Sequence, residues 1–203
     1  MPKSNEREYR LRQLYALDDE KSPYTVEGYA ATFQPYVLYS IDGVNYSERI
    51  EPRAFDTADL SDVIMQFDHE GKVYARSSNG TLNISVDERG LKIRADLSST
   101  AAAKELFEEI RTGLITKMSF GFTVEESHYE ADTHTRVIDR FRKIYDVSAV
   151  SLPANEGTEI GVSTRSWFDG VIESDKQAER LAALELQKRR MLARIKLMGG
   201  NES

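Results

Sequence analysis

A β-strand is indicated by the stretch Gly113-Leu-Ile-Thr-Lys-Met-Ser119-Phe-Gly121-Phe-Thr-Val124, because apolar residues alternate in it with small or polar ones. Side chains along a strand point alternately to its two faces, so the phenylalanines share one face with Met118, whereas Ser119 and Gly121 share the other. A serine on the less bulky face, with a glycine two residues on, lies where an extended peptide backbone could reach its hydroxyl. Ser119 is therefore a candidate nucleophile.

A serine hydroxyl is barely nucleophilic at neutral pH, so the hypothesis requires a base and a group that orients the base. Three histidines are present. His128 and His134 lie in a polar stretch that predicts a hairpin turn, whereas His69 ends the strand-like run that begins at Val63. We therefore expect His69 to be the base. Asp146 is the candidate third member, because it is the single carboxylate in an otherwise apolar and small-residue strand pattern.

Each of these residues also has another interpretation. Asp146 could form an ion pair at the surface with a neighbouring basic residue. A serine on a strand, such as Ser119, is usually just solvated or hydrogen-bonded. His69 between two carboxylates could belong to a metal site, since imidazole and carboxylate groups suit divalent ions. His128 or His134 could replace Asp146 as third member, and Lys117, on the same face as Ser119, could serve as the base. The basic neighbours of Asp146 in the sequence are Arg140, Arg142 and Lys143.

Five segments, in this order, resemble the prohead maturation proteases of tailed bacteriophages: Val26-Glu-Gly28-Tyr-Ala30, Arg49-Ile-Glu-Pro-Arg-Ala54-Phe55, Phe67-Asp-His69, Lys117-Met-Ser119-Phe-Gly-Phe122 and Asp146-Val-Ser-Ala-Val-Ser-Leu-Pro-Ala-Asn155. The resemblance covers residues 24–162. It implies a serine endopeptidase with a β-barrel related to the herpesvirus assembly proteases, and it places the catalytic histidine on His69, the serine on Ser119 and the acidic group on Asp146.

The same resemblance implies what the enzyme acts on. The substrate would be the scaffolding portion of the phage major capsid protein, and the enzyme itself, inside the assembling prohead in the bacterial cytoplasm. No cofactor is expected. The competing hypothesis is a non-enzymatic capsid assembly factor, in which the β domain serves only as a platform.

Composition limits the other classes of function. The chain has 203 residues, a formal net charge of −7 and no cysteine, which excludes disulfides and thiolate zinc sites and suits a reducing compartment. An acidic balance gives no basic field for nucleic acid, so nucleic acid is not an expected partner. No apolar run approaches the ~20 residues that cross a membrane, so we expect neither a membrane partner nor a secretory signal.

Three regions follow from the pattern along the chain: an N-terminal extension over 1–23, a protease domain over 24–162, and a linker with a helical tail over 163–203. The middle region predicts mainly β structure in an α+β fold, a barrel or a sandwich, with one helix over 101–111 that Ser99 or Thr100 can cap and Gly113 ends. Residues 157–169 are loop-like, and 173–198 predict a long amphipathic helix whose apolar seam Lys188 interrupts. We expect this helix either to pack on the protease domain, or to bind scaffold or self-associate.

Overall fold

The computed structural model describes residues 7–17, 20, 22–41, 43–151 and 162–198. The chain forms two compact units, residues 1–163 and 164–203, which we describe separately. The first unit is mainly β structure with a few helices, as an α+β fold predicts. Its strands are β1 (Glu8–Ala16), β2 (Thr25–Thr32), β3 (Tyr36–Ile41), β4 (Val44–Ile50), β5 (Ile64–Phe67), β6 (Glu70–Arg76), β7 (Leu82–Val86), β8 (Gly90–Asp96), β9 (Lys117–Glu130) and β10 (Thr135–Val150), and its helix α1 spans Ala101–Arg111.

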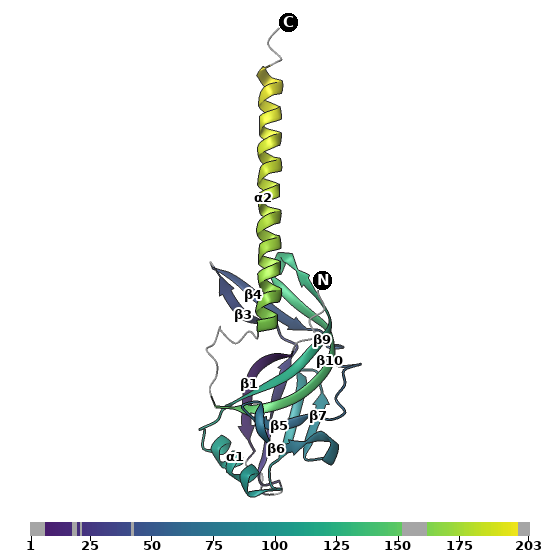
Figure 1. Ribbon diagram of the computed structural model, residues 1–203, viewed down its shortest axis with the longest axis vertical. Coiled ribbons are helices and arrows are strands. Elements are labelled where there is room, and N and C mark those ends of the chain that lie inside the picture. The colour runs from purple at the N-terminus through teal and green to yellow at the C-terminus, as the bar shows by residue number, and fades with distance from the viewer. Residues whose placement is uncertain (1–6, 18–19, 21, 42, 152–161, 199–203) are drawn as a thin grey trace. The chain divides into compact units, whose positions relative to one another are not determined.

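The strands form one mixed sheet in the order β3-β4-β10-β9-β1-β2-β8-β7. The two longest strands, β9 and β10, are antiparallel and run side by side as long curved ribbons (Figure 1). The other edge of β10 pairs in parallel with β4 near its beginning and with β5 near its end. Along this path the sheet is open, since no pairing between described residues joins the outermost strands β3 and β7.

Aromatic side chains hold the centre of the sheet. Phe120 and Phe122 on β9 are fully buried and stack with ring centroids 4.7 Å apart, and Phe141 on β10 meets Phe122 edge-to-face at 5.0 Å. These rings lie on the face of β9 that the alternation of residues 113–124 predicts to be apolar. Burial of such rings is a large favourable contribution to folding, and it leaves Ser119 and Gly121 on the opposite face.

Several local predictions are confirmed. Helix α1 begins after Thr100, whose hydroxyl accepts from Ala103 N at 3.1 Å, and the chain leaves the helix through Gly113 with φ of +77°. β7 and β8 form a hairpin within the region predicted to be mainly β structure. The polar stretch around His134 is the turn between β9 and β10, a short 3₁₀ segment over Ala131–Thr133.

The sequence interpretation assigned residues 8–16 to an extension, but they form β1 inside the sheet, between β9 and β2. Its charged residues explain the difference: Glu8 and Arg10 are buried, with Glu48 and Arg136, in a cluster of two carboxylates and two guanidinium groups. Arg10 Nε donates to Glu48 Oε1 at 2.7 Å, and Arg136 Nη2 donates to Glu8 Oε1 at 2.9 Å. Mutual pairing makes burial of these charges possible, whereas a hydropathy pattern predicts exposure.

The electrostatics of this buried cluster favour its charged state. Burial by itself disfavours the Arg10 cation, but the carboxylates of Glu48 and Glu8 outweigh that effect and raise the pKa of Arg10 well above its usual value. Tyr36 donates its hydroxyl to Glu48 at the edge of the cluster. Burial and the neighbouring carboxylate raise the pKa of Tyr36 to about 12.

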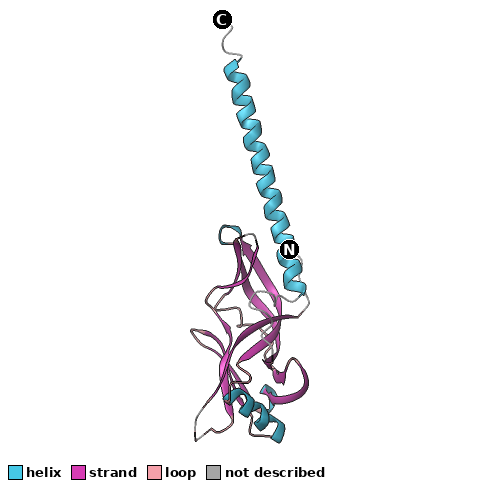
Figure 2. Cartoon of the chain, turned by 90° about the vertical axis from the view of Figure 1, so that its left-hand side faces the viewer, coloured by secondary structure: helices cyan, strands magenta, loops and turns pink. Residues whose placement is uncertain are grey.

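Helix α2 spans Val162–Met198 and accounts for the second unit (Figure 2). The helix expected over 173–198 is therefore present but begins earlier, because 162–169, which looked loop-like, is already helical; the rest of that expected loop lies outside the described residues. Leu181, Leu184 and Met191 on the predicted seam are exposed. None of the helices in the described part of the chain is long and apolar enough to cross a membrane.

Candidate active site

His69 lies in a two-residue turn between β5 and β6, not at the end of a strand as the sequence predicts. Asp68 and His69 have φ of 48° and 61°, the left-handed pair that a type I′ hairpin turn requires. Non-glycine residues rarely adopt this conformation, and such strain is frequent at functional sites. The turn is held by Asp68, whose carboxylate accepts from Ser151 N at 2.9 Å and from Ser151 Oγ at 2.7 Å.

Asp146 lies on β10 directly against this turn. Its side chain is 3% exposed, and its Oδ1 atom lies 2.5 Å from His69 Nδ1. Parallel pairing of β5 with β10 places Ile64 opposite Asp146 and Phe67 opposite Ala149, and from the turn that follows, the His69 side chain contacts the Asp146 carboxylate. Ser148 Oγ donates to the same Oδ1 atom at 3.1 Å, so the carboxylate is held from two sides.

Ser119 lies on β9 beside this pair. Ser148 is the cross-strand partner of Ser119, and Asp146 is the partner of Gly121, so all four residues share one face of the sheet. Two residues along a strand span about 7 Å, which sets the separation of Ser119 from the Asp146 level. The interactions of the described residues include no hydrogen bond between the Ser119 hydroxyl and the His69 ring. Catalytic hydrogen bonds are often long without substrate and tighten when it binds.

Two details differ from the sequence interpretation. Ser119 is 4% exposed, so a peptide carbonyl can reach its hydroxyl only over a small area. Gly121 does not leave bare surface for substrate, because the Asp146 carboxylate and the Tyr9 ring occupy the space above it. The glycine makes room for the acidic group.

Tyr9 and Ser148 are site residues that sequence analysis missed. The Tyr9 ring, on β1, lies with its centroid 4.4 Å from that of His69, so it packs against the imidazole. Ser148 could have been found, because it lies two residues after Asp146 on a strand and must share its face. Tyr9 had no such signal, since only the β1–β9 pairing places it opposite Gly121.

The alternative site residues lie elsewhere or have other partners. His128 is the cross-strand partner of Val137 at the far end of the β9–β10 hairpin. It lies nine residues from Ser119, a separation of roughly 30 Å along a strand. His134 Nδ1 contacts the Tyr129 hydroxyl at 2.9 Å in the turn. Lys117 lies near Ser119, and its Nζ donates to the Gln13 side-chain oxygen at 2.5 Å when the Gln13 amide nitrogen donates to Thr116 O.

Two of the three basic residues near Asp146 in the sequence, Arg140 and Lys143, pair with other acids. Arg140 forms an ion pair with Glu126, and Lys143 Nζ donates to Asp59 Oδ2 at 2.7 Å. The hydrogen bond from Lys143 lowers the pKa of Asp59 well below its usual range. Within the described ranges, no group of three or more His, Cys, Asp or Glu side chains is arranged to hold a metal ion.

Comparison with known proteins identifies the family of the chain. A family model described as caudovirus prohead serine protease matches residues 10–169. The chain belongs to this family. It is therefore a serine protease of the class that matures phage proheads. The chain is also 24% identical over 160 residues to the prohead protease of Enterobacteria phage HK97. The aligned segment covers 77% of this chain and 69% of that protein. No solved structure matches.

The prohead protease match bears on the boundaries of the chain's parts. It begins inside β1 and ends in the first turns of α2, so it includes His69, Ser119 and Asp146. The central position of β1 in the sheet and the beginning of the match at residue 10 both make β1 part of the protease unit. Most of α2 lies beyond the match.

Proposed function

We propose that Ser119 is the nucleophile of this prohead protease, with His69 as its base and Asp146 as the group that orients His69. The observation that carries the proposal is the contact of His69 Nδ1 with the buried Asp146 carboxylate, on the face of the sheet that Ser119 shares. With Nδ1 directed at Asp146, the Nε2 atom is the one free to exchange a proton with a serine.

The reaction would proceed by acyl transfer. Ser119 Oγ attacks the peptide carbonyl carbon while His69 Nε2 takes the hydroxyl proton. The same proton passes to the amide nitrogen as the C–N bond breaks, which leaves an ester on Ser119 and releases the amine product. Water then hydrolyses the ester with His69 again as base. Backbone amides stabilise the oxyanion, as in other acyl transfers, and no cofactor takes part.

The proposed substrate is the scaffolding portion of the phage major capsid protein, and the protease also cuts itself. Family membership supports the capsid-protein partner, because a prohead protease acts where capsid protein is concentrated. The proposed place of action is the interior of the assembling prohead in the host cytoplasm, and nucleic acid and membranes are not partners. The protease domain is proposed to correspond to the herpesvirus-type barrel, with the curved sheet as its wall, and α2 to be a tail that delivers the enzyme, binds scaffold or self-associates.

Family membership argues against the alternative of a non-enzymatic assembly factor. A fluorophosphonate probe tests the proposal directly, since it labels only an activated serine. The wild-type protein and the matched variant Ser127→Ala, which removes a serine from the same strand eight residues from Ser119, should both be labelled and should both cleave co-expressed capsid protein. Ser119→Ala should do neither and remain folded. Capsid protein cleaved normally by Ser119→Ala would end the nucleophile assignment.

A further inference from the structure

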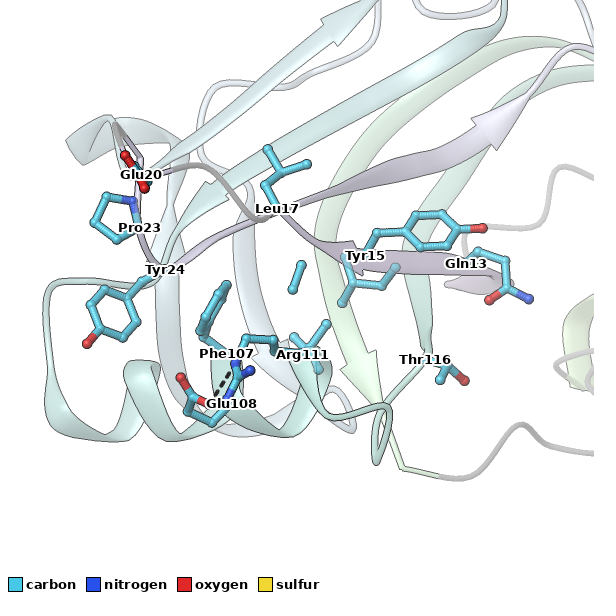
Figure 3. A pocket seen from close by; sticks show the side chains of 13 residues that line it. Gln13, Tyr15, Leu17, Glu20, Pro23, Tyr24, Phe107, Glu108, Arg111 and Thr116 are labelled. Atoms are coloured by element: carbon cyan, nitrogen blue, oxygen red, sulfur yellow. Dashed lines mark hydrogen bonds and ion pairs between the residues drawn. The ribbon is translucent and has the colours of Figure 1, made fainter.

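A pocket of about 680 Å³ lies between β1 and helix α1 (Figure 3). Its wall is mixed: an apolar part comes from Leu14, Ala16, Leu17, Tyr24, Phe107 and Ile110, and a polar part from Gln13, Glu20, Glu108, Arg111 and Thr116. Glu108 on its rim is ion-paired with Arg111 across one turn of α1, with Arg111 Nε 2.9 Å from the carboxylate. The volume exceeds that of any single side chain, and the apolar part of the wall offers a place for a large apolar side chain.

The pocket lies where β9 stops covering β1. Leu14 N donates to Thr116 O at 3.0 Å, but β9 begins only at Lys117, so Thr116 is the last residue on that edge. Leu17 N donates to Thr25 O at 2.8 Å, on the side of β2. Because successive residues of a strand direct their N–H and C=O groups to opposite edges, Ala16 directs its groups away from β2, toward the pocket.

One end of the pocket lies a short way along the sheet from the candidate active site. Gln13 and Thr116 lie at one end of it, and Glu20 and Tyr24 lie at the other (Figure 3). Gln13 is paired with Lys117, two residues along the strands from the pairing of Leu11 with Ser119. Two residues of strand separate these levels, or about 7 Å. An extended peptide with its scissile carbonyl at Ser119 would therefore reach the pocket two to four residues from the cut bond.

We propose that this pocket binds a large apolar side chain of the peptide substrate, two to four residues from the scissile bond, while the peptide backbone lies along the open edge of β1 at Ala16. An open strand edge beside an apolar pocket is a recurring arrangement for binding extended peptides, because the edge bonds the main chain and the pocket selects a side chain. The inference rests on the proposed catalytic role of Ser119. It adds a specificity determinant, made by β1 and α1, that the catalytic residues do not supply.

The test uses the full-length protein and peptides built on the capsid cleavage sequence, which mass spectrometry of the wild-type digest defines. Each position within four residues of the cut is occupied in turn by Phe, Leu, Ala, Ser or Asp, and kcat/KM is measured. We expect one position at which Phe or Leu exceeds Ala by about 10-fold to 200-fold, the range that apolar pockets provide. Asp at that position should be the poorest substrate.

Two variants reduce the volume of the pocket: Ala16→Leu on β1 and Thr116→Leu on the segment before β9. Both should lower the ratio of kcat/KM for the Phe peptide to that for the Ala peptide by at least about 10-fold, mainly through KM. Asn83→Leu is the matched control, because Asn83 lines a separate polar pocket with Thr25 and Arg94. Its ratio should equal that of the wild type.

Fluorophosphonate labelling and a thermal melt of the same samples show whether each variant is folded with a reactive serine. If labelled, folded Ala16→Leu and Thr116→Leu both keep the wild-type ratio, or if the wild type has no apolar preference, the pocket is not a substrate subsite. That result would leave the proposed function intact. Loss of labelling in the wild type would instead overturn the proposed function itself.

Discussion

The carboxylate of Asp146 occupies the space that a side chain on Gly121 would need. The two residues are cross-strand partners on β9 and β10, and a Cβ atom at Gly121 would lie 2.7 Å from Asp146 Oδ2 and 2.9 Å from Tyr9 Cε1. Side-chain carbons are essentially never found so close to such atoms. A residue two positions from the candidate nucleophile thus sets the position of the acidic group that contacts His69.

Gly121→Ala should therefore impair catalysis without removing any proposed catalytic group. The new methyl group displaces the Asp146 carboxylate from its 2.5 Å contact with His69 Nδ1, so the imidazole loses its orientation. We expect kcat to fall by about 100-fold or more, toward the roughly 10⁴-fold loss that follows neutralisation of a triad carboxylate. Steady-state kinetics with a capsid-derived peptide give the measurement.

Gly170→Ala is the matched control for this substitution. Gly170 lies within α2, nothing lies within 4 Å of a Cβ atom placed there, and it is exposed. Alanine stabilises a helix interior by about 1 kcal/mol relative to glycine, so activity should be unchanged and α2 slightly more stable. Equal activity of the Gly121→Ala and wild-type proteins would show that the Asp146 position does not govern the rate.

Asp146→Asn should lose most activity with the fold intact, and His69→Ala should lose nearly all of it. An asparagine can keep the shape of the site while favouring the wrong imidazole tautomer, so the effect is on kcat more than on KM. Ser148→Ala removes one hydrogen bond to the carboxylate and should have a smaller effect. Full activity of Asp146→Asn, measured on the same peptide, would make the contact with His69 structural only.

Glu48→Gln should destabilise the protease unit by about 3–5 kcal/mol, the usual loss when one member of a buried ion pair is removed. Glu48 accepts from Arg10 at 2.6 and 2.7 Å and from Arg136 at 3.3 Å, so neutralisation leaves two buried guanidinium groups with one carboxylate. Urea unfolding measures the loss. Glu126→Gln, in an exposed pair with Arg140, is the control and should change little. A small effect at both sites would show that the buried cluster is not a major source of stability.

Stability should also fall at alkaline pH because of Tyr36, whose pKa is raised to about 12 by burial and by Glu48. An unfolded tyrosine ionises near pH 10, so between about pH 10 and 12 the unfolded chain releases this proton while the folded chain keeps it. The contribution of Tyr36 to the free energy of unfolding is thus fully present below about pH 10. It is lost as the pH rises toward 12, by at most about 1.4 kcal/mol per pH unit. The free energy of unfolding, measured with urea from pH 8 to 11, should decline more steeply for the wild type than for Tyr36→Phe. Parallel profiles of the two proteins would refute this.

A chain that ends at Ser163 should keep peptide cleavage but lose incorporation into proheads. The division between the compact units falls after that residue, and His69, Ser119 and Asp146 all precede it. The exposed Leu181, Leu184 and Met191 of the removed helix are then available for the contact that delivers the enzyme. Peptide hydrolysis and co-purification with assembled shells are the two measurements. Loss of hydrolysis with normal incorporation would reverse the roles that we propose for the two units.

The sequence by itself determined the local structure and the family. The alternation around Ser119 predicted a strand with its phenylalanines buried, and the pattern over 101–111 predicted α1 together with its cap at Thr100, because side-chain periodicity and capping depend on neighbours within a few residues. The family resemblance rests on short ordered segments, which need no tertiary structure to be recognised. It pointed to His69, Ser119 and Asp146 in the same way.

Only the tertiary structure decided how these residues meet. The 77-residue separation of His69 and Asp146 closes because β5 pairs in parallel with β10, a long-range pairing that no local pattern encodes. Long-range pairing also brings Tyr9 into the site. It explains the buried charges of Glu8 and Arg10 as well, because a sequence pattern predicts charged residues to be exposed and only partners from distant strands make their burial possible. Strand pairing across long sequence distances, more than the composition of any segment, sets the geometry of the site.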